Sequence, residues 1–274
     1  IAEIKAMGYE IAQPDINYSG HEWEWSDDRS AFVPPLTSVK GVGKAAVEEI
    51  MRHRPYETLH ELFYNDDGKW KHSKVNKTCF DSLCKIEGLG SIKEMHDGTI
   101  TSHRQIHQIV IDNYNDLKKS KFGMTMRKAK KEDAPEILPI LINEYELTED
   151  WTRGEKIKMY YDLTSCLRDD LLFPTEVITK IYNADVPSVL EIKEAGKFIV
   201  WFCVQEIIQK KTKKGKTFYR LKVTDDKNNS GWVRLWGKLP NGMDEFTIWL
   251  AEVSNDKSWG ASTSGYKLRP LVTE

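Results

Sequence analysis

The sequence predicts an α+β chain of several domains, in which a helical region is followed by a C-terminal five-stranded β-barrel. Two observations lead to this prediction. From residue 36 the apolar residues recur at helical spacing, and prolines and glycines separate these runs. From residue 196 the pattern changes to five short β-rich runs with turn residues between them. The 274 residues accommodate roughly two domains of ordinary size.

The composition is that of a globular protein, with 40% hydrophobic and 30% charged residues and a formal net charge of −2. Because the charges nearly cancel, any indication of nucleic-acid binding has to come from local patches. No apolar run approaches the ~18 residues of a membrane span. No C-x-x-C pair is present, so we expect the four cysteines to be buried, reduced thiols of a cytosolic protein: Cys79, Cys84, Cys166 and Cys203.

Four segments follow one another along the chain. Residues 1–33 contain a short strand, a Pro-Asp turn and an extended hairpin-like stretch, and their start resembles the interior of a larger protein. Residues 34–117 carry the helical pattern. Residues 118–195 begin with the run KKSKFGMTMRKAKK, which predicts a mobile basic linker, and continue as a helical connector. The β-rich runs occupy residues 196–274.

The most specific short motif is SVKGVGKAAVEEI, residues 38–50. A nucleotide-phosphate loop does not fit, because a Walker loop needs G-x-x-x-x-G-K-[ST] and a dinucleotide fold needs a third glycine after a strand. With h for an apolar residue, the observed spacing is h-x-x-h-x-G-h-G-x-x-x-h-x-x-h. This spacing is typical of a helix-hairpin-helix motif.

In such a motif, Gly41 and Gly43 are expected to form a tight turn with positive φ, and Val42 to fill the gap between two helices. The helix that begins at Lys44 would direct unpaired N–H groups and its positive dipole end at a ligand. A DNA phosphate suits this site, and Lys40 and Lys44 flank it. An ordinary helix–turn–helix packing unit is the alternative.

A second, looser copy of the motif is KIEGLGSI, residues 85–92. Gly88 and Gly90 follow a helical pattern, although no lysine occupies the place that corresponds to Lys44. Paired hairpins of this kind usually hold both strands of a duplex, so we expect Gly88 and Gly90 to bind DNA. A purely structural helix C-cap is the alternative.

Two neighbouring β-rich runs place aromatic and cationic residues on one face and aliphatic residues on the other. The aromatic and cationic residues are Phe218, Arg220, Lys222, Trp232, Arg234 and Trp236. A lysine-rich hairpin beside them contains Lys213, Lys214 and Lys216. This arrangement is typical of an OB-fold that stacks unpaired bases while it neutralises phosphates. A solvated basic hairpin on a structural barrel is the alternative.

We find no catalytic or metal-binding constellation. The aspartate pairs are adjacent in sequence, whereas a two-metal site needs carboxylates that converge on ions about 4 Å apart. His103 and His107 are spaced i, i+4 but lack a third ligand. We therefore expect binding modules without catalytic residues, metal ligands or a cofactor.

The order of these parts resembles the C-terminal portion of family C DNA polymerases, the alpha subunits of bacterial DNA polymerase III and their phage relatives. The pieces that carry the resemblance are IAEIKAMGYEIAQPDIN, LTSVKGVGKAAVEEI, KVNKTCFDSL, WTRGEKIKMYYDLTSC and KKTKKGKTFYRLKVTD, and together they span nearly the whole chain. LTSC replaces the LSGHP that is more usual in the family, which indicates an unusual or phage branch.

The resemblance implies that residues 1–33 end a fingers region, that residues 34–117 form a tandem helix-hairpin-helix domain, and that residues 196–274 form an OB domain. It implies a part of a DNA-directed DNA polymerase, a nucleotidyltransferase, whose partners are double- and single-stranded DNA and the rest of the polymerase. The catalytic aspartates and their Mg²⁺ belong to the upstream palm, so no catalytic residue is carried over. The implied location is the cytoplasm of a bacterium or phage-infected host.

A sliding clamp is a further partner in the family, which uses a peptide like Q-x-x-[LM]-x-F. The sequences after Gln105 and Gln108 do not match it. Two other functions stay open at this point. One is a stand-alone nucleic-acid-binding accessory or repair factor, and the other is a helical interaction scaffold with a structural barrel.

Overall fold

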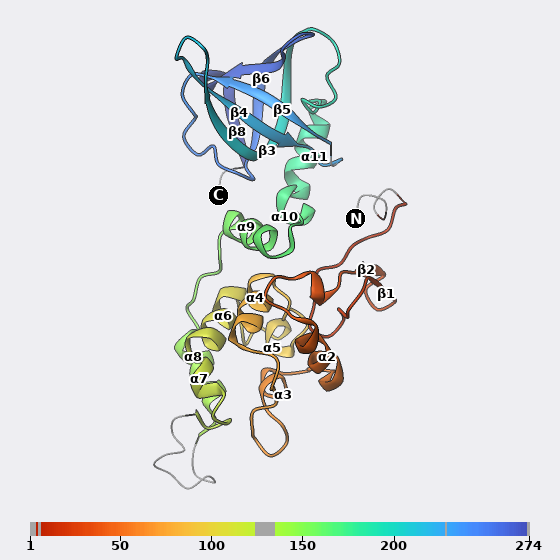
Figure 1. The fold of residues 1–274 in the computed structure, drawn as a ribbon, viewed down its shortest axis with the longest axis vertical. Coiled ribbons are helices and arrows are strands. Elements are labelled where there is room, and N and C mark those ends of the chain that lie inside the picture. The colour runs from red at the N-terminus through yellow and green to blue at the C-terminus, as the bar shows by residue number, and fades with distance from the viewer. Residues whose placement is uncertain (1–3, 5–6, 124–134, 228, 273–274) are drawn as a thin grey trace. The chain divides into compact units, whose positions relative to one another are not determined.

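The chain forms two units in a computed structural model, which describes residues 4, 7–123, 135–227 and 229–272. The first unit comprises Ile1–Trp151 and Met159–Cys166, and the second comprises Thr152–Lys158 and Leu167–Glu274. Figure 1 shows the first unit as the helical part and the second as the part that contains the large sheet. The connector that we expected at 118–195 is therefore divided between the two units.

The first unit is mostly helical. A short antiparallel hairpin, β1 (Glu24–Ser26) and β2 (Ala31–Val33), is its only pair of strands among the described residues. Its helical elements are η1 (Leu36–Ser38), α2 (Lys44–His53), α3 (Leu59–Phe63), α4 (Lys77–Lys85), α5 (Lys93–His96), α6 (His103–Asp112), α7 (Tyr114–Leu117), α8 (Ile137–Glu144) and the C-terminal half of α9 (Arg153–Thr164).

Side-chain caps begin several of these helices. The Asn76 side chain accepts a hydrogen bond from the Cys79 amide at the start of α4, and Ser102 accepts one from Gln105 at the start of α6. In α2, Arg52 and His53 lie in the last turn, where they complement the helix dipole. The helix that we expected before the first glycine turn is a single 3-10 turn, because Val39 is already extended.

One apolar core holds the first unit together. It includes Ile16 from the opening segment, Leu36 and Val42 around the first hairpin, and Phe80 from α4, all at most 4% exposed. Because Ile16 belongs to this core, the described part of the opening segment packs together with residues 34–117.

The described part of the expected basic linker is also packed in place. The Lys121 amide donates to the Gly68 carbonyl, and the Ile137 amide donates to the Lys121 carbonyl at 2.7 Å. A Cβ on Gly123 would lie 2.4 Å from Cδ1 of Ile137. Residues 118–123 therefore pack against the first unit, and the remaining part of the predicted linker, residues 124–131, lies outside the described residues.

The second unit is built around a six-stranded sheet, shown in teal and blue in Figure 1. Its elements are the N-terminal half of α9, α10 (Asp169–Leu172), α11 (Thr175–Asn183), β3 (Gly196–Lys211), β4 (Thr217–Thr224), β5 (Ser230–Trp236), β6 (Ile248–Asp256), β7 (Gly260–Ser264), η3 (Gly265–Lys267) and β8 (Leu268–Val272). We expected five strands, and the additional one is β7.

The strand order is β3-β4-β5-β7-β6-β8, and β6 also pairs with β3. Only β5 and β7 are parallel. The first half of β3 pairs with β6 and its second half with β4, and the register of the β3–β4 pairing shifts between Val204 and Glu206.

Alternation along β3 produces two apolar cores in this unit. Phe202 points into a core with Leu221 and Val233, whereas Trp201 and Cys203 belong to a second core with Ile181 of α11. In the part of the chain that the structure describes, no helix has the length and apolar character needed to cross a membrane.

Candidate nucleic-acid interfaces

The first glycine turn has one position that requires glycine and one that does not. Gly41 has φ +89°, and a Cβ there would lie 2.6 Å from the Ser82 Oγ of α4. Gly43 has φ −79°, and a Cβ there would meet nothing within 4 Å. The expectation of positive φ at both glycines is therefore wrong for Gly43, which is the N-cap of α2.

Val42 lies between the two glycines and is only 4% exposed. Its amide donates to the Val39 carbonyl at 3.0 Å, which closes the turn. The side chain belongs to the core of the first unit, together with Leu36 and Val47. Val42 therefore anchors the hairpin from inside, as its position between the glycines predicts.

The N-terminus of α2 opens outward beside this turn. The intrahelical ladder begins with the amides of Ala46 and Val47, which both donate to the Gly43 carbonyl. The N-cap offers no side-chain acceptor, and Gly43 and Lys44 are both exposed. A ten-residue helix without a cap directs its first N–H groups and the positive end of its dipole at the surroundings.

Lys40 does not flank this helix N-terminus in the way that we expected. Its Nζ donates to the Asp162 carbonyl at 2.6 Å, and its amide donates to the Leu163 carbonyl at 2.8 Å. Both acceptors lie at the C-terminal end of α9, where a cation interacts favourably with free carbonyl groups. Lys40 therefore fixes the hairpin against α9.

The second glycine turn uses its amides within the protein. The Gly88 amide donates to the Leu83 carbonyl at 2.8 Å, and the Gly90 amide donates to the Glu87 carbonyl at 3.1 Å. Glu87, not a glycine, takes the positive φ of +62°. This is the geometry of a helix C-terminus, and it leaves Gly88 and Gly90 without an N–H group for a ligand.

The helix after the second turn also differs from α2. α5 has only four residues, and the Lys93 amide at its start donates to the Glu57 carbonyl at 2.8 Å. Of the two copies, only the first therefore presents an open helix N-terminus.

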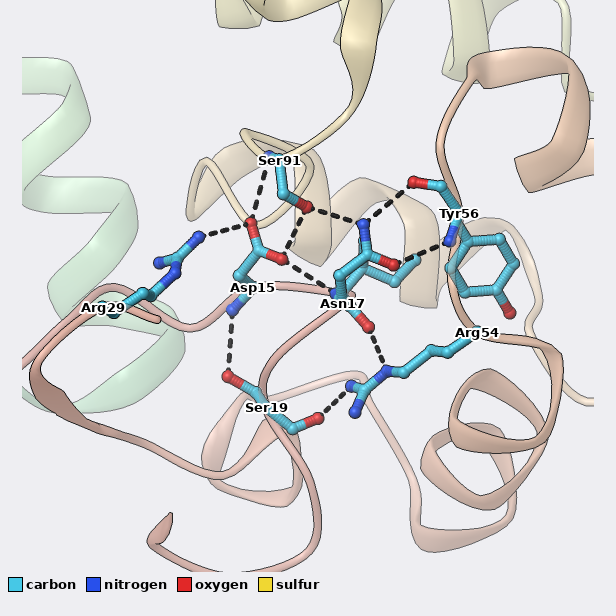
Figure 2. Close-up of polar contacts among 8 residues, drawn as sticks. Asp15, Asn17, Ser19, Arg29, Arg54, Tyr56 and Ser91 are labelled. Carbon is cyan, nitrogen blue, oxygen red and sulfur yellow. Dashed lines mark hydrogen bonds and ion pairs between the residues drawn. The ribbon is translucent and has the colours of Figure 1, made fainter. Parts of the chain in front are cut away.

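A polar network that was not predicted from the sequence joins the opening segment to the loop after α2 and to the second glycine turn (Figure 2). Asp15 accepts hydrogen bonds from the Ser91 hydroxyl at 2.7 Å and from the Ser91 amide at 3.1 Å. The Asn17 side chain pairs with the Tyr56 backbone, accepting from its amide at 2.8 Å and donating to its carbonyl at 2.9 Å. The Pro-Asp turn gave the only sequence signal for this network.

Glu49 of α2 makes a second buried connection, to the loop before α4. Its carboxylate accepts hydrogen bonds of 2.7–2.9 Å from the amides of Ser73, Lys74 and Val75 and from the Ser73 hydroxyl. Burial acts to raise the pKa of Glu49, but these hydrogen bonds outweigh it and lower the pKa from 4.5 to about 2. Glu49 is therefore ionised at neutral pH and connects α2 to the loop before α4.

The second candidate interface is the outer face of β4 and β5. Their antiparallel register places Phe218 opposite Trp236, Arg220 opposite Arg234 and Lys222 opposite Trp232. All six sequence-predicted residues therefore lie on one face, while Leu221, Val223 and Val233 turn into the core.

Aromatic rings and guanidinium groups stack on this face. The Phe218 and Trp236 ring centroids are 5.2 Å apart, and the Arg220 guanidinium lies 4.3 Å from the centre of the Trp232 ring. The Arg234 guanidinium lies 5.9 Å from the Phe218 ring. These contacts form a continuous aromatic and cationic stripe along the two strands.

The lysine-rich turn between β3 and β4 lies at the Phe218 end of the stripe. Lys213, Lys214 and Lys216 are exposed, and Nζ of Lys216 is 5.5 Å from the Trp236 ring. Trp259, which the sequence analysis missed, extends the same face: it is 71% exposed, and the Arg234 guanidinium lies 5.6 Å from its ring. Its position in the polar turn DKSWG gave no periodic signal.

In the part of the chain that the structure describes, no residues come together in a way suited to hold a metal ion. Among the described residues, no group of three or more histidine, cysteine or acidic side chains converges. Asp225 is buried as a turn acceptor, with the amides of Lys227 and Asn229 at 3.1 and 2.9 Å. The cysteines are free thiols, and Cys79, Cys84 and Cys203 are buried as we expected. Cys166 is only half-buried, so the expectation of burial is wrong for this residue.

The turn, the buried valine and the open helix define the helix-hairpin-helix class of motif. Residues 8–98 match the family model described as a helix-hairpin-helix motif. The match begins within the first 33 residues, which agrees with the shared core of the first unit.

Curated relatives of this region are DNA polymerase III alpha subunits. The protein from Thermotoga maritima is 39% identical over 62 residues, which are 23% of this chain and 7% of the relative. The proteins from Chlamydia pneumoniae and Chlamydia muridarum are 31% and 34% identical over 87 residues, 30% of this chain and 6% of each relative. The resemblance to these subunits is confirmed for the helix-hairpin-helix region, and the matched segments span only 6–7% of the relatives' length.

Proposed function

We propose that this chain is a DNA-binding part of a replicative DNA polymerase of the DNA polymerase III alpha type. The first hairpin holds the backbone of duplex DNA, and the sheet of the second unit holds single-stranded template. The observation that carries the proposal is the open N-terminus of α2 in a region similar to DNA polymerase III alpha subunits.

The duplex contact follows from the chemistry of that helix end. Exposed amides at Gly43 and Lys44 suit a phosphate oxygen, and the positive dipole end of a ten-residue helix favours its charge. The exposed Lys44 adds a cation beside them. Because no base edge is involved, the contact positions the duplex without reading its sequence. In this proposal Lys40, Gly41 and Val42 shape the turn, and Gly88 and Gly90 close the second one.

For the second unit we propose an OB-type barrel that binds single-stranded DNA. The proposal is supported by the strand pairing, because β6 pairs with both β7 and β3. The five strands β3, β4, β5, β7 and β6 are therefore paired in a closed ring, as in a barrel. The stripe on β4 and β5 offers rings for unpaired bases and cations for phosphates. The lysines of the β3–β4 turn add positive charge at the rim.

Phosphoryl transfer belongs, in this proposal, to aspartates and Mg²⁺ in another part of the polymerase. The rest of that polymerase is then the chain's main protein partner. The proposed setting is the cytoplasm of a bacterium or of a phage-infected host.

The test of the hairpin uses Gly43→Asp. An aspartate is a good N-cap, and the space at Gly43 is open, so the variant should fold at least as stably as the parent. Its carboxylate would occupy the α2 amides and repel phosphate, so we expect affinity for duplex DNA to fall tenfold or more, by roughly 1.4 kcal/mol at least.

Gly98→Asp is the charge control, because it adds the same charge at an exposed turn where a Cβ also meets nothing within 4 Å. Since Gly98 has φ +82°, the aspartate costs some stability there, and urea unfolding of both variants establishes that they are folded before binding is compared. Binding is measured by fluorescence anisotropy with a labelled duplex at fixed salt. Equal affinities of the Gly43 and Gly98 variants would refute the phosphate contact at α2.

A further inference from the structure

Two adjoining cavities lie at the Trp236 end of the stripe in the second unit. One, of about 650 Å³, is lined by Lys213, Lys214, Lys216 and Trp236. The other, of about 410 Å³, shares Lys216 and Trp236 and continues to Lys238 and Tyr266. Because Lys216 and Trp236 line both cavities, the two open cavities adjoin at these residues, and their linings together extend from the β3–β4 turn past Trp236 to η3.

Two of the residues that line the second cavity, Lys238 and Gly265, belong to backbone segments in close contact. A Cβ on Gly265 would lie 2.6 Å from the Lys238 carbonyl oxygen, so η3 and the β5–β6 loop touch through their main chains. This contact fixes the loop that carries Lys238 against the turn that carries Tyr266.

Tyr266 stands exposed at the η3 end of these linings. Its side chain is 85% exposed, and Nζ of Lys267 lies 5.9 Å from the ring centre. Lys267 is already paired with Glu252, so the cations left to meet a phosphate in this cavity are Lys216 and Lys238. An exposed ring beside two lysines offers a nucleotide both a stacking surface and charge neutralisation.

We propose that this cavity binds one further nucleotide of single-stranded DNA, with its base stacked on Tyr266 and its phosphate near Lys216 and Lys238. The inference rests on the proposed single-strand function of the stripe and extends it. The strand then runs along β4 and β5 from Trp232 to Trp236 and continues past Trp236 to η3. The ligand is an unpaired nucleotide of any sequence, because stacking and phosphate contacts do not read base edges.

Length dependence provides the test. Labelled oligodeoxythymidylates of about 4 and about 12 nucleotides bracket the site size of such a face. With the 274-residue chain, Tyr266→Ala should weaken binding of the longer strand by roughly tenfold and that of the shorter strand by less than about twofold. Tyr266→Phe keeps the ring and should bind like the parent chain.

Two further variants make the outcomes distinct. Lys238→Glu should also weaken only the longer strand, by roughly tenfold, through charge reversal. Tyr182→Ala removes an exposed tyrosine of α11 that lines neither cavity and should leave both affinities unchanged. Loss of affinity on Trp236→Ala with no effect of Tyr266→Ala or Lys238→Glu on the longer strand would overturn this inference alone. A parent chain that binds neither strand would remove the proposed single-strand function as well.

Discussion

At the scale of single residues, the carboxylate of Glu49 joins α2 to the loop before α4. Glu49 extends from α2 into a ring of three backbone amides and one hydroxyl that precede α4. His72 lies 3.7 Å away, and burial lowers its pKa to about 4, so it is neutral at pH 7. The helix that carries the proposed phosphate site is therefore held by a charge whose partners are main-chain groups.

Replacing Glu49 with glutamine should lower the free energy of unfolding at pH 7 by about 3 kcal/mol, because a pKa lowered from 4.5 to about 2 stabilises the folded state by that amount. A depressed pKa contributes fully above the unfolded value and is lost as the pH falls from about 4.5 toward about 2. The difference between parent and Glu49→Gln in urea unfolding should therefore shrink across that window.

Glu48→Gln is the matched control for this prediction. Glu48 is the neighbouring carboxylate on the exposed side of α2, and its replacement should change stability by less than about 0.5 kcal/mol. A constant difference between parent and Glu49→Gln from pH 7 to pH 3 would contradict the proposed role of the ionised carboxylate.

The two glycine positions of the first turn should differ in how well they tolerate a side chain. Gly41→Ala should lower the free energy of unfolding by about 2 kcal/mol, because φ +89° is strained for alanine and its Cβ would press on Ser82. Gly43→Ala should cost about 1 kcal/mol or less, as expected at an N-cap. Thermal or urea unfolding of both variants gives the comparison.

The double variant Gly41→Ala/Ser82→Ala separates the two causes. Removing the Ser82 hydroxyl relieves the contact at 2.6 Å but leaves the backbone strain. We expect partial recovery of stability relative to Gly41→Ala. If Ser82→Ala adds its own cost with no recovery, the close approach of Gly41 to α4 does not matter for stability.

At the scale of elements, the sequence predicts what its own periodicity encodes. The helix after the glycine turn and the strands β4 and β5 fall where the patterns place them, because amphipathic spacing and alternation are local properties. β7 was missed because GASTS has no large apolar residues, and its pairing with β5 and β6 is set by the rest of the sheet. The expected helix before the turn is only η1, since Val39 leaves the helical conformation to enter the turn.

The lysine turn between β3 and β4 gives a prediction at this scale. If its lysines release counterions on binding, Lys213→Gln/Lys214→Gln should make the dependence of log affinity on log salt less steep by about 1.4, or 0.7 per lysine on a single strand. The measurement is a salt titration of binding to a labelled single strand. An unchanged slope would mean that these two lysines contact no phosphate.

At the scale of the whole molecule, the opening segment shows what sequence reasoning did not reach. We separated residues 1–33 from the helical domain because their patterns differ, but Asp15 and Asn17 find their partners at Tyr56 and Ser91 (Figure 2). Asn17 and Tyr56 are 39 positions apart in the chain, and Asp15 and Ser91 are 76 positions apart, so no local pattern relates these partners. Trp259 and Tyr266 could not be selected from the sequence for the same reason. Their proposed roles depend on residues that are distant in the chain but adjacent in the fold.

If the chain has two separate DNA interfaces, one substitution should lower its affinity for duplex DNA and another its affinity for single-stranded DNA. Gly43→Asp should weaken binding to duplex DNA tenfold or more and leave binding to an oligodeoxythymidylate within about twofold of the parent. Trp236→Ala should do the reverse, because it removes a stacking ring worth about 1–3 kcal/mol per base while α2 stays intact. Both affinities are measured on the full chain by anisotropy at one salt concentration. If each variant weakened binding of both DNA forms equally, the data would favour a single shared binding surface. They would contradict separate sites for duplex DNA at the first glycine turn and for single-stranded template on the sheet.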